Sequence, residues 1–220
     1  MKEPTVKKKI SGLEPFSFGY CGNVKLASAD HIQTPFVEVL DGRNSTVSGS
    51  PINLDELGKF LYLSNRTKRT ELSADGHVLQ WKNFATPGAL SSVSTLLVPP
   101  TRECIYHYDG ARHQLKQISN SLEVAVLLNA ACREVIAEID QSSWLIWLVC
   151  DETLLDSKYE NYHSLAFRES GGISATHALV AHALGCGFRQ LGINGYSLAS
   201  SLSDQRKLFG VGLATLGKLP

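Results

Sequence analysis

A short polar segment contains the residue types that bind phosphate groups. Arg43 and Ser45 lie within residues 41–46, just before a stretch with helical periodicity. An arginine can bind a phosphate through two parallel N–H groups, and nearby hydroxyl groups add further donors. A polar turn before a helix is also common where no ligand binds. The segment therefore predicts a phosphate site only if other parts of such a site accompany it.

Two adjacent glycines indicate a second place where a ligand could approach the backbone. Gly171 and Gly172 precede a run of small and apolar residues at helical spacing, and two more glycines follow it. This pattern predicts a helix over residues 172–184 that begins at the glycine pair. Its alanines would leave room for a partner chain or a flat ligand. A buried core helix would give the same pattern.

A Pro-Gly turn is the third candidate. Pro87 and Gly88 are followed by Ala89 and Leu90, and then by an apolar run typical of a strand. Small residues let the backbone of such a turn lie close to a planar ring. The same sequence is often only a turn.

The elements that would position these candidates follow from the pattern of the chain. Proline and glycine are frequent in residues 1–37 and predict an irregular N-terminal arm, whereas residues 65–75 are polar and predict a surface loop. Alternating helical and strand patterns predict one α+β domain over residues 38–220. The expected helices are 53–63, 121–139 and 172–184. The expected strands are 93–98, a hairpin over 104–115, 143–150 and 209–217.

Composition limits the classes of function. The chain has 220 residues, with 21 basic and 21 acidic side chains. This balance gives no general basic face for nucleic acid or for an anionic membrane. The longest apolar run, residues 144–150, is too short to cross a bilayer, and we expect no signal peptide. Five cysteines without a CxxC pair indicate reduced, structural thiols and hence a cytoplasmic protein.

The histidines do not form a metal-binding pattern. His177 and His182 are five positions apart and would point to different faces of a helix. His107 and His113 flank the predicted hairpin turn without a set of cysteines or carboxylates beside them. We therefore predict no metal site.

The candidate segments occur in the order of a known family. The chain resembles the FMN-dependent nitroreductase superfamily, and within it the azoline dehydrogenases, which oxidise thiazoline and oxazoline rings in peptide-derived natural products. The matching segments are residues 43–45, 54–57, 88–90, 106–108, 158–159, 169–171 and 184–187. The chain departs from the family at Val47, where a second basic residue is usual, and before Gly88, where a Pro-Ser pair is missing.

The resemblance implies a set of cofactor-binding residues. These are Arg43, Ser45, Gly88, Ala89, Leu90, Gly171, Gly172 and Lys218. The arginine, the serine and Lys218 would hold the FMN phosphate. The Gly-Ala-Leu turn would run beneath the isoalloxazine ring. The amides of the glycine pair, at a helix start, would face the edge of that ring.

The resemblance also implies an architecture and a reaction. The expected fold is a nitroreductase-like mixed sheet flanked by helices, built as an intertwined homodimer with FMN at the subunit interface. Lys158 would take a proton from the ring of a small-molecule or peptide substrate, and Tyr159 would orient or relay that proton. A biosynthetic partner enzyme is expected. Two alternatives remain: an NAD(P)H-dependent nitro or quinone reductase, and a non-catalytic protein of the same fold within a biosynthetic complex.

Overall fold

The computed structural model describes residues 2–29, 31–46, 50–136 and 143–219. Its α-helices are α1 Phe36–Gly42, α2 Leu54–Asn65, α3 Leu122–Val135, α4 Glu152–Lys158 and α5 His163–Ala183. Its strands are β1 Thr5–Val6, β2 Tyr20–Lys25, β3 Arg69–Leu72, β4 Val78–Trp81, β5 Val93–Val98, β6 Tyr106–Asp109, β7 Gln114–Ile118, β8 Trp144–Asp151, β9 Tyr159–Glu160, β10 Cys186–Gln190 and β11 Leu208–Lys218. Two 3₁₀ turns are η1 Pro87–Ala89 and η2 Leu198–Leu202. Val47, where the chain departs from the family, lies outside the described residues.

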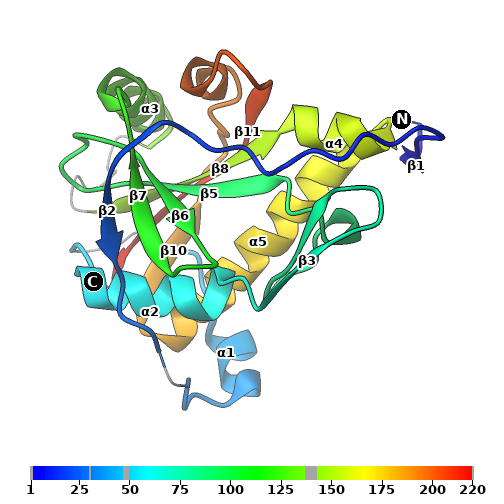
Figure 1. The fold of residues 1–220 in the computed structure, drawn as a ribbon. Helices are drawn as coiled ribbons and strands as arrows, with labels where there is room; N and C mark the ends of the chain where they lie inside the picture. Colours follow the sequence, from blue (N-terminus) through cyan, green and yellow to red (C-terminus); the bar gives the residue numbers. More distant parts are fainter. Residues whose placement is uncertain (1, 30, 47–49, 137–142, 220) are drawn as a thin grey trace.

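A seven-stranded sheet forms the centre of the molecule, in the order β10-β11-β8-β5-β6-β7-β2. Each described pairing in this sheet is antiparallel, so the sheet is not mixed within one chain. Two small ribbons, β1-β9 and β3-β4, lie outside it. The expected α+β class is confirmed. In Figure 1, α5 runs across the sheet from α4 toward α1, and the N-terminus lies beside α4.

The central strand β8 is buried on both faces, which explains its continuous apolar sequence. Ile146 and Leu148 belong to one core, together with residues of α2, α4 and α5. Leu145 and Trp147 point to the other core, which α3 and η2 complete. Successive side chains of a strand alternate between faces, so one strand can anchor both layers. The chain therefore folds as helices packed on both sides of one sheet.

Helix α2 forms where the sequence predicts it. Asn53 caps the helix by accepting a hydrogen bond from the Glu56 amide at 2.9 Å, while the Glu56 side chain accepts one from the Asn53 amide at 2.8 Å. This reciprocal pair satisfies two amides that would otherwise lack a partner at the helix start. Leu57, Phe60 and Leu61 are fully buried against the sheet. The expected strands 93–98, 143–150 and 209–217 and the hairpin over 104–115 are confirmed as well.

Two expectations about irregular segments are wrong. Tyr20–Lys25, within the predicted arm, is strand β2 and pairs with β7 at the edge of the sheet. Arg69–Leu72, within the predicted loop, is strand β3 and pairs with β4. Both strands are mostly polar and exposed, so they lack the alternation that reveals a half-buried strand. Their backbone hydrogen bonds need no apolar face. The boundary at residue 37 itself stays a prediction.

Candidate functional site

One pocket gathers three of the predicted cofactor-binding residues. Arg43, Ser45 and Gly171 line a pocket of about 360 Å³ beside α5. The small residues Ser174, Ala175 and Ala178 form its wall along the helix, and Phe188 and Gln190 of β10 line it too. Pockets that bind cofactors usually measure about 300–1,000 Å³. A cation and a hydroxyl beside a wall of small residues fit a flat, anionic cofactor.

The end of α1 brings Arg43 to this pocket. Arg43 follows the last residue of α1, and its amide donates to the Val39 carbonyl at 3.1 Å. Three residues later, the Thr46 amide donates to the Phe188 carbonyl of β10 at 3.3 Å. These two hydrogen bonds fix the segment between α1 and β10. Arg43 and Ser45 are both exposed, and no ion pair engages Arg43 within the described residues.

The glycine pair lies inside α5 and not at its start. Because α5 begins at His163, Gly171 and Gly172 lie about two turns into the helix, where amides are bonded within the helix. The expectation that these amides face a ligand from a helix N-terminus is therefore wrong. Buried Ala166 and Glu169 hold the preceding turns against the sheet, and this packing outweighs the cost of about 1 kcal/mol per glycine in a helix.

The glycine pair nevertheless leaves open space and a close contact. A methyl group added at Gly171 would meet nothing within 4 Å, whereas one at Gly172 would lie 3.8 Å from the Ala85 carbonyl oxygen. Gly172 thus lies against the loop that contains the Pro-Gly turn. The pocket and that loop are neighbours along α5.

The Pro-Gly turn has an unusual backbone. Gly88, Ala89 and Ser91 have φ angles of 52°, 58° and 51°, in the left-handed region. Glycine adopts this region freely, but each non-glycine residue there costs about 1 kcal/mol or more. Such backbone strain clusters at functional sites. The expected turn is confirmed, and Leu90 is fully buried in the core, which leaves only its backbone for contact with a ligand.

Lys158 and Tyr159 meet at Gly88. A methyl group added at Gly88 would lie 2.5 Å from the Tyr159 hydroxyl oxygen and 4.0 Å from the Lys158 Nζ. The Lys158 side chain is only 15% exposed, and its Nζ lies 3.5 Å from a carboxylate oxygen of Asp75. Burial raises the pKa of Tyr159, and the Asp75 charge adds to that shift. The structure thus brings the predicted catalytic pair together with one of the predicted turn residues.

Lys218 lies apart from these groups. It ends β11, its amide donates to the Ser50 carbonyl at 2.8 Å, and its Nζ lies 3.3 Å from a Glu56 carboxylate oxygen of α2. It does not line the pocket of Arg43 and Ser45. Its role with a phosphate stays a prediction.

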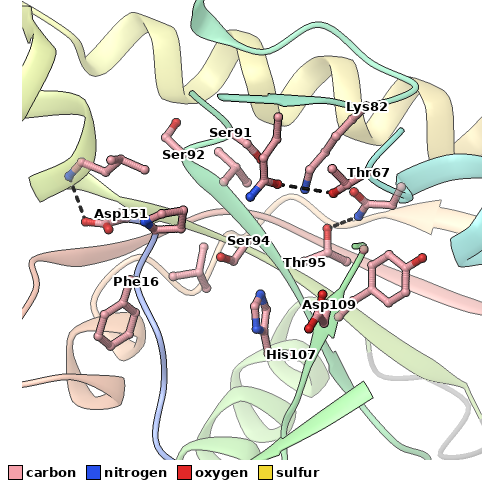
Figure 2. A pocket seen from close by; sticks show the side chains of 18 of the residues that line it. Phe16, Thr67, Lys82, Ser91, Ser92, Ser94, Thr95, His107, Asp109 and Asp151 are labelled. Carbon is pink, nitrogen blue, oxygen red and sulfur yellow. Dashed lines mark hydrogen bonds between the residues drawn. The ribbon is translucent and has the colours of Figure 1, made fainter. Parts of the chain in front are cut away.

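A separate small cavity on the other side of the loop is not a flavin site. Figure 2 shows Lys82, His107 and Asp109 around it, with Ser94 and Thr95 of β5. Burial lowers the pKa of Lys82 and lowers that of His107 to about 3, so the protein disfavours their charged forms. The cavity measures about 90 Å³, well below the volume of pockets that bind cofactors.

Sequence reasoning gave no role to Glu169, which links α5 to the strained loop. One of its carboxylate oxygens accepts hydrogen bonds from the Ser92 hydroxyl at 2.5 Å and from the Ser92 amide at 3.2 Å. Burial raises the pKa of Glu169 to about 7 from 4.5. Its place beside the glycine pair was visible in the sequence, but its burial was not.

Glu169 should make stability fall as pH rises. Because its folded pKa is raised from 4.5 to about 7, the native state binds this proton more tightly than the unfolded state. The stabilisation is complete below pH 4.5 and is lost as pH rises through 7, which costs about 3 kcal/mol in the free energy of unfolding. Glu169→Gln should remove this fall, as measured by urea unfolding at pH 5 and pH 8. Equal pH dependence in both proteins would show that Glu169 does not titrate in this window.

Within the described part of the chain, no group of three or more His, Cys, Asp or Glu side chains is placed to hold a metal ion. The predicted absence of a metal stays a prediction. All five cysteines are free, and four of them are buried. No helix among the residues described here is long and apolar enough to span a membrane.

Comparison with known proteins identifies the fold. No protein-family model matches the sequence, and no curated protein matches it significantly. A candidate nitroreductase from Ralstonia eutropha superposes with a TM-score of 0.70 at 16% identity, over 98% of this chain and 99% of that one. A chain of the E. coli microcin synthetase McbBCD complex, with truncated pro-MccB17 bound, superposes with a TM-score of 0.56 at 14% identity. The match covers 87% of this chain and 85% of that one. A nitroreductase with bound FMN from Bacteroides fragilis gives 0.51 at 11% identity over 86% and 90%. The chain has the nitroreductase fold.

Proposed function

We propose that the protein is an FMN-dependent oxidoreductase of the azoline-dehydrogenase type. The observation that carries this proposal is the pocket that joins Arg43, Ser45 and Gly171 along the small-residue face of α5. Structural neighbours that bind FMN, and one within a microcin synthetase, support it at the level of the fold. The resemblance in the order of the motifs supports the narrower assignment.

In this proposal, the pocket would hold the cofactor as follows. Arg43 and Ser45 would bind the phosphate, since a guanidinium and a hydroxyl complement its charge and its acceptors. The face of α5 at Gly171 would lie against the ring system, because no side chain there holds a ligand away from the helix. The backbone of Gly88, Ala89 and Leu90 would complete the site from the strained loop.

The proposed reaction removes a proton and a hydride from the azoline ring. Lys158 would accept the proton from the ring carbon, and the Tyr159 hydroxyl, which reaches the same point above Gly88, would orient the ring. Bound FMN would supply the two-electron acceptor for the hydride, with oxygen as the final acceptor. The partial burial of both side chains supports a role other than surface contact.

We further propose a cytoplasmic homodimer that works with a partner enzyme of azoline formation. Free cysteines support a reducing compartment. The microcin synthetase McbBCD complex, which has truncated pro-MccB17 bound, supports a partner enzyme. Support for the dimer comes from α1, where Phe36, Val37 and Leu40 are 65%, 66% and 50% exposed. Large apolar side chains grouped on a surface helix usually mark an interface.

Phe36→Asp should weaken the dimer. An aspartate in the first turn of α1 is compatible with the helix, so the change would remove apolar contact area without unfolding the helix. We expect the dimer dissociation constant to rise at least about tenfold, as measured by size-exclusion chromatography with light scattering. Leu122→Asp is the matched control, because Leu122 is 57% exposed in the first turn of α3. Equal effects of the two variants would contradict an interface at α1.

The test of the function is oxidation of a peptide that carries a thiazoline or oxazoline ring. The FMN-loaded protein should convert the ring to the aromatic azole under oxygen, with a mass loss of about two hydrogens per ring. NADPH-driven reduction of nitro compounds or quinones without azoline oxidation would replace the proposal with the reductase alternative. If the FMN-loaded protein catalyses neither of these reactions, the non-catalytic alternative is favoured.

A further inference from the structure

The tip of the β3-β4 hairpin lies against Lys158, although the two are far apart in sequence. Asp75, between β3 and β4, places a carboxylate oxygen 3.5 Å from the Lys158 Nζ. The exposed fractions of the two side chains are only 25% and 15%. A contact between distant segments that are both sheltered from water restricts the positions open to the lysine amine.

Asp75 is itself held in place by its own turn. The Ser73 hydroxyl donates to its Oδ1, and the His77 Nδ1 lies 3.1 Å from the same oxygen. The Ser73 hydrogen bond is the main reason why the pKa of Asp75 is lowered, against an opposing effect of desolvation. Asp75 therefore remains a carboxylate and faces Lys158 with its second oxygen.

His77 joins the hairpin tip to the helix that ends at Lys158. Its side chain is fully buried, and its Nε2 is hydrogen-bonded to the Ser157 hydroxyl of α4 at 2.8 Å. The Ser157 hydroxyl donates to the Leu154 carbonyl at 2.7 Å, within the same helix. Asp75, His77 and Ser157 have the composition of a Ser-His-Asp triad. The Ser157 proton, however, is donated to the Leu154 carbonyl and not to His77. These three residues thus anchor the hairpin to α4.

The N-terminal segment holds the same group of residues from a third side. β1 pairs with β9, and the Lys7 amide donates to the Lys158 carbonyl at 2.9 Å. Further along, a methyl group added at Gly12 would lie 2.5 Å from the Asp75 carbonyl oxygen and 2.6 Å from Gly76. Only a glycine allows the chain to pass this close to the hairpin tip.

We infer that Asp75 is a positioning residue for Lys158, held in place by His77, Ser157 and the passage of the chain at Gly12. The contact fixes the Lys158 amine beside the Tyr159 hydroxyl above Gly88. Only the expected effect of Asp75 on turnover rests on the proposed function. The position of the amine is a property of the protein without cofactor or substrate.

The reactivity of Lys158 tests the contact directly. Limited acetylation of the full-length protein with acetic anhydride, followed by mass spectrometry, gives the labelling rate of each lysine. Asp75→Asn should increase the rate at Lys158 about fivefold relative to the exposed lysines, because the ion pair is lost. The asparagine carbonyl can still accept hydrogen bonds from Ser73 and His77, so the turn should persist. Asp75→Glu, which restores the charge, should return the rate toward that of the wild type.

Asp156→Asn is the matched control, since Asp156 lies on α4 and pairs with Lys7 at 2.9 Å. It should leave the labelling of Lys158 unchanged.

Gly12→Ala moves the hairpin without changing a charge and should raise the labelling rate at Lys158. Gly19→Ala is its control, because a methyl group there has only a 4.0 Å contact and should not change that rate. Unchanged labelling of Lys158 in both Asp75→Asn and Gly12→Ala would overturn the inference.

Turnover then separates this inference from the proposed function. If azoline oxidation occurs, Asp75→Asn should lower kcat about tenfold and leave KM within about twofold, as expected for a misplaced catalytic group. Normal kcat in this variant would overturn the positioning role. If the wild type shows no azoline oxidation, the proposed function fails, and the labelling result still decides whether Asp75 positions Lys158.

Discussion

Lys158→Ala is expected to lower azoline turnover by about a thousandfold while the protein still binds FMN. The reason is chemical: the variant keeps the pocket at Arg43 and Ser45 but removes the proposed acceptor of the proton from the ring carbon. Tyr159→Phe should have a smaller effect, because its proposed role is to orient the ring. Single-turnover measurements with the FMN-loaded protein would report the chemical step directly.

Lys7→Ala is the control for the loss of a lysine at this place. Lys7 forms an ion pair with Asp156 at 2.9 Å, and its backbone amide, which the substitution keeps, donates to the Lys158 carbonyl. Its loss should leave turnover close to that of the wild type. Full activity of Lys158→Ala would remove Lys158 from the mechanism, and loss of FMN from that variant would show that the lysine supports the cofactor instead.

Arg43→Ala is expected to raise the FMN dissociation constant about a thousandfold, because the variant would lose the two proposed charge-assisted hydrogen bonds to the phosphate. Arg43 is exposed at the end of α1, so its removal should not unfold the protein. Quenching of flavin fluorescence on binding would measure the affinity. Riboflavin, which lacks the phosphate, should bind the wild type and the variant equally.

Substitutions of two other basic residues serve as comparisons for Arg43→Ala. Arg133→Ala removes an arginine from the last turn of α3 and should leave FMN binding unchanged. Lys218→Ala tests the predicted second cation, whose amine already lies 3.3 Å from Glu56. A large effect there would place Lys218 at the phosphate. FMN binding that is unchanged in Arg43→Ala would contradict the phosphate assignment.

The elements with a regular apolar pattern were predictable from the sequence. Helix α2 has a capping residue at Asn53 and an apolar stripe, and β8 is an apolar run between turns. Both signals are local, so they need no knowledge of the rest of the chain. Arg43 and Ser45 were singled out by their residue types, and the structure brings both to one pocket, while their role with a phosphate stays a prediction.

The start of α5 was not predictable in the same way. A glycine pair usually marks a break, but Gly171 and Gly172 continue a helix that begins at His163. The turns before the pair are helical because they pack against the sheet and the loop. The hydrogen bond from the Ser92 hydroxyl to Glu169 is one such contact. Tertiary packing thus decided the outcome against local propensity.

The surroundings of Lys158 could not be read from the sequence for a different reason. Asp75 and His77 lie in a polar stretch that resembles an ordinary surface loop, and their partners are about eighty residues away along the chain. Nothing in the local pattern connects the two segments. Asp75 and His77 come close to Lys158 and Ser157 only because β3 pairs with β4 and the hairpin packs against α4.

The measurement that tests the central claim most directly is the absorbance spectrum of the purified protein after addition of FMN and removal of the excess. We predict a yellow protein with a flavin band near ~450 nm, and no rapid bleaching by NADPH without oxygen, because the proposed electron source is the azoline ring. Rapid bleaching by NADPH would favour the reductase. A colourless protein that does not retain FMN would contradict the proposal that this nitroreductase fold is a working flavoenzyme.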